Sequence, residues 1–185
     1  MQAAIRSCTK RDVQILTNTI RQSFLTVAKR FGLTGENAPR HPSNCTADWI
    51  ERDMSRGVSY FVIDTENGIV GCVALEHASS EVCYLKRLAV LPGHRTRGMG
   101  RALVRHALSR AKDLGVRRVG IGMIAQDTEL KDWYKRIGFA EGETKAFPHL
   151  PFGVTFMSYD LEKGKPKSRS RIWTRRASQA ELRDE

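Results

Sequence analysis

The stretch Leu88–Val104, LAVLPGHRTRGMGRALV, predicts a strand, a tight turn and a helix in immediate succession. Its first residues complete the apolar segment Val82–Val90 (VCYLKRLAV), which is typical of a buried strand. After the glycines, apolar residues recur at spacings of three and four up to Leu114, which predicts an amphipathic helix that Gly115 ends. This unit decides the fold class, because it fixes one strand of a sheet and the helix that packs on it.

The turn inside this stretch has the features of a diphosphate-binding site. The first N–H groups of a helix lack partners within the helix, and the helix dipole favours an anion beside them. Gly98 and Gly100 place no side chain where a phosphate oxygen would approach, and Arg95, Arg97 and Arg101 add positive charge. The phosphate-loop pattern GxxxxGK[ST] and the pattern GxGxxG are both absent. The alternative is a tight turn in which the two glycines serve packing alone.

The rest of the chain alternates between the patterns of strands and helices. We expect helices over 9–31, 46–56 and 127–137, and further strands over 3–7, 59–65, 69–77, 117–125, 154–161 and from Phe139 onward. Such an order does not fit a purely parallel or purely antiparallel sheet. It predicts an α/β fold with a mixed, largely antiparallel central sheet and helices on both faces.

Length and composition set the broad class of protein. The chain has 185 residues, of which 41% are hydrophobic, and this suits a single domain with a real core. No apolar run approaches the roughly 18 residues of a membrane span, so no membrane partner is expected. The cysteines contain no CxxC pair, which argues against a metal site and fits a reducing, cytoplasmic location. They lie at Cys8, Cys45, Cys72 and Cys83.

Positive charge is concentrated at the C-terminal end. The chain has 31 Lys and Arg against 20 Asp and Glu, a formal net charge of +11, and residues 162–185 hold eight of these basic residues against four acidic ones. This segment has too few large apolar groups to offset the entropy of ordering. We therefore expect a domain over 1–161 and a disordered basic tail over 162–185. The tail is either a plain solvated extension or a weak contact to RNA or another polyanion.

Two motifs with their spacing give the chain a resemblance to a known superfamily. Arg95, Gly98 and Gly100 match the acyl-CoA signature [QR]-x-x-G-x-[GA], and Tyr134, Gly138 and Phe139 match a YxxxGF element. In both motifs and in element order the chain resembles the GNAT superfamily of N-acetyltransferases. The resemblance implies the GNAT-like acyl-CoA N-acyltransferase fold and an enzyme that uses acetyl-CoA as co-substrate, with no metal.

The resemblance also implies where acetyl-CoA binds. The pantetheine arm is expected along Leu88, Ala89 and Val90, between the strands 82–90 and 117–125, which splay apart. Asp127 stands where the family often has an Asn that contacts this arm, so it either binds the arm or simply caps a helix. The diphosphate is expected on the backbone of six turn residues, Arg95, Thr96, Arg97, Gly98, Met99 and Gly100.

Two residues are candidates for proton transfer. Tyr134 matches the family's general acid, since a phenol can protonate the thiolate that leaves when the amine attacks; the alternative is a core aromatic beside Trp133. Glu76 is our first candidate for the base, and Glu81 and His77 follow it. For Glu76 and Glu81 an ordinary solvated carboxylate is the alternative, and GNAT enzymes also use a chain of waters.

The acceptor site is expected in elements that vary within the superfamily. The loops 37–44 and 147–152 mix Pro, His and aromatic or amide side chains. Arg40 and His41 would favour an anionic group on the acceptor. Tyr84 lies mid-strand and could line the pocket; strict alternation would place Leu88 on the same face.

The leading hypothesis is direct transfer of the acetyl group to a primary amine of a small molecule or a protein. No cysteine occupies an obvious nucleophile position, although Cys83 keeps a covalent route open. The alternatives are a non-catalytic acyl-CoA sensor and an RNA-associated protein that uses the basic tail. A homodimer is compatible with each of these hypotheses.

Overall fold

The computed structural model describes residues 4–66 and 68–162. Within them a seven-stranded sheet has the order β1-β2-β3-β4-β5-β7-β6, in which only β4 and β5 are parallel neighbours. This confirms the predicted mixed, largely antiparallel α/β fold. The strands are β1 Ala4–Ser7, β2 Ser59–Thr65, β3 Gly68–His77, β4 Val82–Val90, β5 Arg118–Ile124, β6 Ala140–Ala146 and β7 Gly153–Asp160, and the helices are α1 Val13–Phe31, α2 Ala47–Ser55, α3 Met99–Asp113 and α4 Thr128–Ile137.

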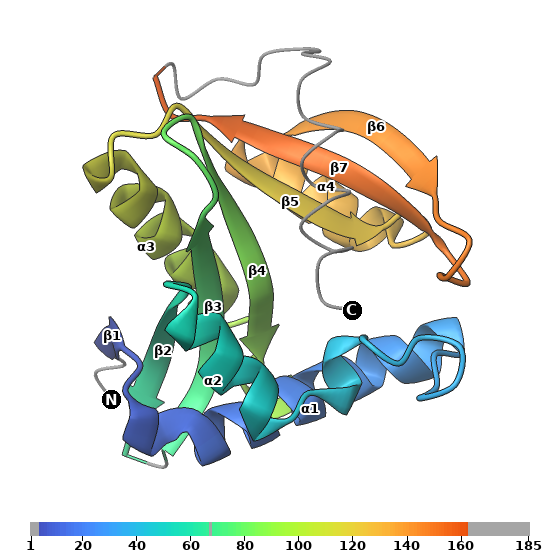
Figure 1. The fold of residues 1–185 in the computed structure, drawn as a ribbon, viewed down its shortest axis with the longest axis horizontal. Helices are drawn as coiled ribbons and strands as arrows, with labels where there is room; N and C mark the ends of the chain where they lie inside the picture. Colours follow the sequence, from blue (N-terminus) through green and yellow to red (C-terminus); the bar gives the residue numbers. More distant parts are fainter. Residues whose placement is uncertain (1–3, 67, 163–185) are drawn as a thin grey trace.

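Helices cover both faces of the sheet, and the side chains of β2 show why (Figure 1). Tyr60 and Val62 point into a core with α1 and α2, whereas Phe61 and Ile63 point into a second core with α3 and Tyr134 of α4. Successive residues of a strand face opposite sides, so a strand that is apolar throughout must be covered twice. The continuous apolar runs of the central strands therefore require both helical layers.

The first helix begins differently from its prediction. Thr9 and Asp12 form the expected capping box, but the box caps a 3₁₀ turn, Lys10–Asp12, that leads into α1. Arg6 of β1 pairs with Asp12 at 2.8 Å and holds the pKa of that carboxyl well below its usual range. The predicted stop at Gly32 is confirmed, since Gly32 adopts a left-handed φ of 63° there.

Strands β4 and β5 separate after a short paired segment. The parallel register joins only Val82–Tyr84 to Arg118–Gly120, although β4 continues to Val90 and β5 to Ile124. Figure 1 shows β5, β7 and β6 turning away from β1–β4 beyond this point. The predicted splay is thus confirmed, and the backbone groups of β4 from Leu85 onward that point toward β5 have no partner strand there.

A bulge in β4 changes which side chains share a face. The register with β3 shifts between Ala74, which opposes Lys86, and Cys72, which opposes Ala89, and Arg87 adopts a left-handed φ of 48°. Leu88 consequently packs toward the core that α3 covers, on the face opposite to Tyr84. The expectation that Tyr84 and Leu88 share a face was wrong, because one extra residue inverts the alternation.

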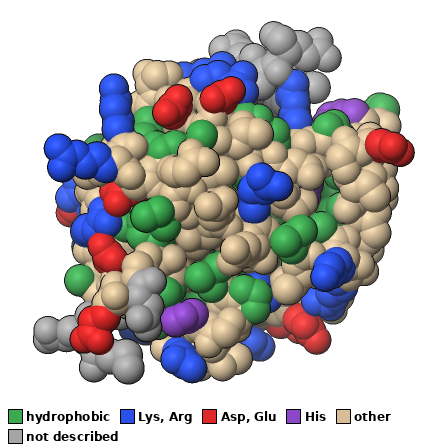
Figure 2. Space-filling view, turned by 90° about the horizontal axis from the view of Figure 1, so that it is seen from below, with side chains coloured by type: hydrophobic (Ala, Val, Ile, Leu, Met, Phe, Trp, Pro, Cys, Tyr) green, Lys and Arg blue, Asp and Glu red, His purple; other side chains and the backbone are tan. Residues whose placement is uncertain are grey.

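Several predictions concern the surface and the chain end. Among the described residues, no helix is both long and apolar enough to cross a membrane. The predicted tail coincides, apart from Glu162, with residues 163–185, which lie outside the described part. The face seen in Figure 2 carries basic, acidic and apolar side chains in separate spots, and the most exposed large apolar residues of α1 are Ile15 and Leu25. The expected homodimer stays a prediction.

Candidate active site

The N-terminus of α3 is open to an anion. Its cap residue is Gly98, with a left-handed φ of 79°, and no described side chain accepts a hydrogen bond from the first turn. Thr96 also has a positive φ, of 65°. Alternation of such left-handed residues turns successive N–H groups toward one concave side. No acidic residue lies in this first turn, so the positive end of the helix dipole is left without a counter-charge.

The three arginines of this turn have different tasks. Arg95 donates to the carbonyl oxygens of Val90 at 3.0 Å and Ser23 at 2.7 Å, and to the hydroxyl of Thr26 at 3.0 Å. Its guanidinium therefore fastens the turn to α1 and to the end of β4. Arg97 and Arg101 are exposed on either side of Gly98, so these two residues add positive charge that faces the solvent.

The open helix start adjoins the free edge of β4. A side-chain carbon at Gly100 would meet the Trp133 ring at 3.5 Å and Val90 at 3.9 Å, so α4, α3 and the end of β4 meet here. Leu88 and Ala89 precede this junction on the strand. The structure thus brings the predicted diphosphate and pantetheine residues into one continuous region.

Tyr134 is buried in α4 behind this junction. Its side chain is 5% exposed and its ring contacts Trp133 at 4.9 Å and Phe139 at 5.2 Å between centroids. Burial raises the pKa of Tyr134, so the phenol stays protonated throughout the neutral range. The alternative of a core aromatic beside Trp133 agrees with this packing, and the role of general acid stays a prediction.

Asp127 caps α4. Its Oδ1 accepts the backbone N–H of Leu130 at 3.3 Å and pairs with Arg30 of α1 at 3.4 Å. Arg30 also pairs with Glu129 at 3.3 Å, so a basic side chain from the far end of α1 joins two acidic groups at this helix start. The cap predicted as the alternative for Asp127 is confirmed, and a contact to pantetheine stays a prediction. Sequence reasoning missed Arg30, which is 97 residues away.

The candidate bases occupy three different settings. Glu76 pairs with Lys86 of the neighbouring strand at 2.7 Å, and both side chains are about one-third exposed or less. Glu81 is exposed and pairs with Arg117 at 3.6 Å. His77 is exposed and follows Glu76 on the opposite side of β3. Of the three, Glu76 comes nearest to the splayed part of β4, since it opposes Tyr84, the last residue paired with β5, and reaches Lys86 beyond it.

Aromatic side chains gather around Tyr84 on this face. Tyr84 packs with Val154 and Phe156 of β7 and with Phe147 and Phe152 of the loop 147–152. One of the two predicted acceptor loops therefore borders the gap between β4 and β5.

Cys83 points away from this gap, into the core with α3, and burial raises the pKa of its thiol to about 11. This placement disfavours a covalent route through Cys83.

The second predicted loop differs in one respect from expectation. His41 is 9% exposed, its Nδ1 lies 2.8 Å from the Ser43 hydroxyl, and its ring meets Phe24. Burial lowers the pKa of His41 to about 4, so the ring is neutral at pH 7. A buried, neutral His41 argues against its part in the expected preference for an anionic acceptor group, and the part of Arg40 stays a prediction.

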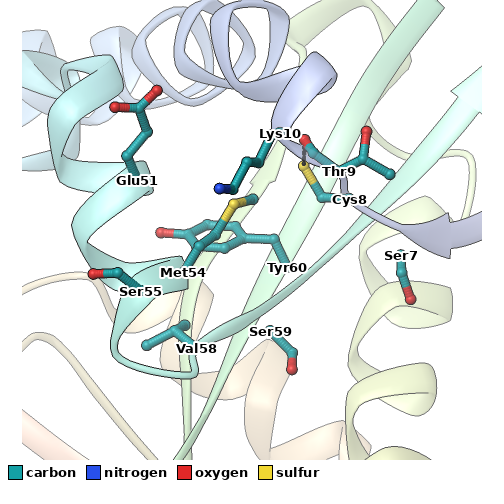
Figure 3. A pocket seen from close by; sticks show the side chains of 10 residues that line it. All are labelled: Ser7, Cys8, Thr9, Lys10, Glu51, Met54, Ser55, Val58, Ser59 and Tyr60. Carbon is teal, nitrogen blue, oxygen red and sulfur yellow. Dashed lines mark hydrogen bonds between the residues drawn. The ribbon is translucent and has the colours of Figure 1, made fainter.

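A separate cavity of about 650 Å³ lies between β1, α2 and the start of β2. Figure 3 shows the Tyr60 ring in the middle of the lining side chains, with Met54 next to it. None of the predicted site residues lines this cavity. Within the described ranges 4–66 and 68–162, no group of three or more His, Cys, Asp or Glu could hold a metal ion.

Comparisons with known proteins agree with this geometry. A family model described as acetyltransferase (GNAT) domain matches residues 56–141. The chain is 25% identical over 138 residues to the uncharacterized N-acetyltransferase YjgM of Escherichia coli K12, covering 73% of this chain and 80% of that protein. It is 30% identical over 89 residues to the uncharacterized N-acetyltransferase CT2212 of Chlorobaculum tepidum, covering 48% and 54%.

Solved structures share the fold. The paiA N-acetyltransferase of Thermoplasma acidophilum in complex with coenzyme A superposes with a TM-score of 0.73 at 16% identity, covering 86% of this chain and 99% of that one. The acetyltransferase yncA of Salmonella typhimurium with acetyl-CoA gives 0.66 at 19% identity, covering 87% and 95%. These structures, at such low identity, show the shared fold. The family model over residues 56–141 and the N-acetyltransferase relatives support a GNAT-superfamily acetyltransferase.

Proposed function

We propose that this protein transfers the acetyl group of acetyl-CoA directly to a primary amine. The observation that carries the proposal is the uncapped, acid-free start of α3 beside the unpaired edge of β4. An anion needs the first feature and an amide-bearing arm needs the second. The residues present therefore fit the two parts of CoA that the family binds in this way.

Each part of the region would hold one part of the co-substrate. The N–H groups from Thr96 to Gly100 would bind the diphosphate, with Arg97 and Arg101 adding charge. The backbone of Leu88, Ala89 and Val90 would bind the pantetheine amides. Bound acetyl-CoA supplies an activated thioester. A backbone N–H of β4 directed at its carbonyl oxygen would stabilise the negative charge that develops there.

Tyr134 and Glu76 would move the protons. Tyr134 keeps its proton because burial raises its pKa, and we assign it to protonate the leaving sulfur. Glu76 would accept a proton from the amine, directly or through water. Lys86 holds the Glu76 Oε2 at 2.7 Å, so an acceptor ammonium would have to share this carboxylate or displace Lys86. The aromatic group around Tyr84 would line the path of the acceptor.

An amine-library screen that measures released CoA thiol tests this proposal. We expect acetyl-CoA to stabilise the protein against heat and at least one amine to accelerate thiol release over the buffer rate. Absence of a thermal shift at saturating acetyl-CoA would refute the proposal. A thermal shift without turnover on any amine would instead support the acyl-CoA sensor.

The contact of the basic tail with a polyanion also stays a prediction. Measuring salt-dependent RNA binding of the protein with and without residues 162–185 tests it.

A further inference from the structure

The bulge of β4 lies where strand pairing is interrupted on both sides. Arg87 has a left-handed φ of 48°, which side chains other than glycine rarely adopt. On the β3 side the ladder is interrupted, because Ala74 opposes Lys86 while Cys72 opposes Ala89. On the other side β5 has already turned away. The register therefore pairs the residues on either side of Arg87 but not Arg87 itself, so a contact outside the ladders can decide how this backbone is held.

That contact is made by the Arg87 side chain. The bulge turns it toward α1 and α2, where the guanidinium donates to Asp53 and to the Tyr60 hydroxyl. Tyr60 in turn donates to Asp53 Oδ2 at 2.6 Å, which closes a three-residue network. Burial alone would lower the pKa of Arg87, but the Tyr60 and Asp53 partners raise it, so the guanidinium stays charged. We call this network the clamp.

The clamp ties three elements together. Asp53 lies in the last turn of α2 and its carbonyl oxygen accepts the N–H of Val58 just before β2. Tyr60 lies on β2, and β3 runs between β2 and β4. Opposite Tyr60, β3 carries the small residue Ala74, which leaves room for the Arg87 guanidinium to reach across β3. The side chains are largely buried, with 19% exposure for Arg87 and 15% for Asp53. Charge-assisted hydrogen bonds are directional, so the buried pair of Arg87 and Asp53, together with the Tyr60 hydroxyl, constrains the orientation of the Arg87 side chain.

We propose that the clamp is a positioning device that orients the bulged segment of β4 for the pantetheine and acetyl parts of acetyl-CoA. This rests on the proposed function, since it assumes that Leu88–Val90 receive the arm. Arg87, Asp53 and Tyr60 act through the backbone and touch neither reacting atom. The diphosphate subsite at α3 lies beyond the bulge and is fastened separately by Arg95, so the clamp affects one end of the co-substrate.

Comparing the binding of two ligands distinguishes the pantetheine end of the co-substrate from its nucleotide end. Calorimetry would compare acetyl-CoA with adenosine 3′-phosphate 5′-diphosphate, which lacks the pantetheine and acetyl groups. We expect Tyr60→Phe, Asp53→Asn and Arg87→Gly each to weaken acetyl-CoA about tenfold and to leave the nucleotide within about twofold. Arg87→Gly is informative because glycine adopts the left-handed φ without strain, so the bulge stays allowed while the clamp is lost. Arg87→Lys keeps a cation and should recover part of the affinity.

The control is Arg110→Gln, which removes an exposed arginine paired with Asp113 at 3.3 Å and should change neither affinity. Hydrogen exchange of amides 85–90 in the ligand-free protein should be faster in the clamp variants. Should Arg87→Gly fail to fold, Tyr60→Phe tests the same network with the loss of one hydroxyl. If the clamp variants bound acetyl-CoA as tightly as the wild type, or lost affinity equally for both ligands, the proposal that the clamp orients β4 for the pantetheine end would be overturned. A wild-type protein that binds neither ligand would contradict the proposed function itself.

Discussion

Helices α3 and α4 begin in the same topological position and in opposite electrostatic states. Each follows one of the two parallel strands, β4 and β5, at their carboxyl ends. The start of α3 has a glycine cap and no acidic residue in its first turn. At the start of α4 the Asp127 side chain accepts a hydrogen bond from the Leu130 N–H, and Glu129 lies in the first turn. Arg30 forms ion pairs with both carboxylates.

This difference teaches where an anion can bind. A helix start attracts negative charge wherever its N–H groups are free, and a side-chain carboxylate satisfies that attraction internally. Helix α4 contains its own anion, whereas α3 leaves the place for a ligand. The four predictions that follow test this contrast, beginning with the largest expected effect.

Gly98→Asp would close the start of α3 in the way that Asp127 closes α4. A side-chain carbon at Gly98 meets no atom within 4 Å, and Asp tolerates a left-handed φ better than most residues. We expect the carboxylate to repel the diphosphate and to weaken acetyl-CoA on the order of a hundredfold. Calorimetry measures this, with Gly98→Asn as the uncharged control. Equal affinities of the two variants would place the diphosphate elsewhere.

Tyr134→Phe removes a hydroxyl from α4 without disturbing its capped start. We expect turnover to fall about tenfold or more, with acetyl-CoA affinity nearly intact, because the proposed role of the phenol is to protonate the leaving sulfur. The raised pKa of Tyr134 keeps the wild-type phenol protonated below pH 10. The ratio of wild-type to variant rates should therefore be constant from pH 6 to 9. Undiminished turnover would show that Tyr134 only packs.

Asp127→Ala tests whether the α4 cap is structural. We expect the free energy of unfolding to fall by about 1 kcal/mol, as for other lost N-caps. Acetyl-CoA affinity should change less than about threefold. Thermal melts and calorimetry report the two quantities, and Glu129→Gln, which keeps the cap, serves as the comparison. A tenfold loss of acetyl-CoA affinity would instead assign Asp127 to the pantetheine arm.

Arg101→Gln should produce the smallest effect. Arg101 is exposed and follows the open start of α3, so its attraction to a phosphate is screened by salt. We expect acetyl-CoA to bind about threefold less tightly at low salt and nearly normally at high salt. Titrations at two ionic strengths measure this. Lys112→Gln, at the opposite end of α3, should leave the affinity for acetyl-CoA unchanged at both ionic strengths. If Arg101→Gln and Lys112→Gln weakened binding equally, the cause would be the net charge of the protein and not the place of Arg101.

Much of the fold could be predicted because its signals are local. The glycines of the α3 turn, the apolar spacing of α1 and the continuous apolar strands each specify an element within a few residues. The bulge at Arg87 gave no such signal, because an extra residue in a strand changes neither its composition nor its length in a recognisable way. The adjacent Lys86 and Arg87 in the strand VCYLKRLAV were its only trace, and Arg87 acquires meaning only beside Asp53 and Tyr60.

The sequence by itself determined which elements form and where the start of a helix is left open, whereas the face that Leu88 presents depended on the bulge. Tertiary structure decided which charged groups remain available to a ligand. The Arg95 guanidinium is hydrogen-bonded to α1, the Glu76 carboxylate is paired with Lys86, and burial keeps His41 neutral. The physical reason is that local structure depends on neighbours along the chain, whereas the state of a charge depends on solvent and on partners brought close only by folding.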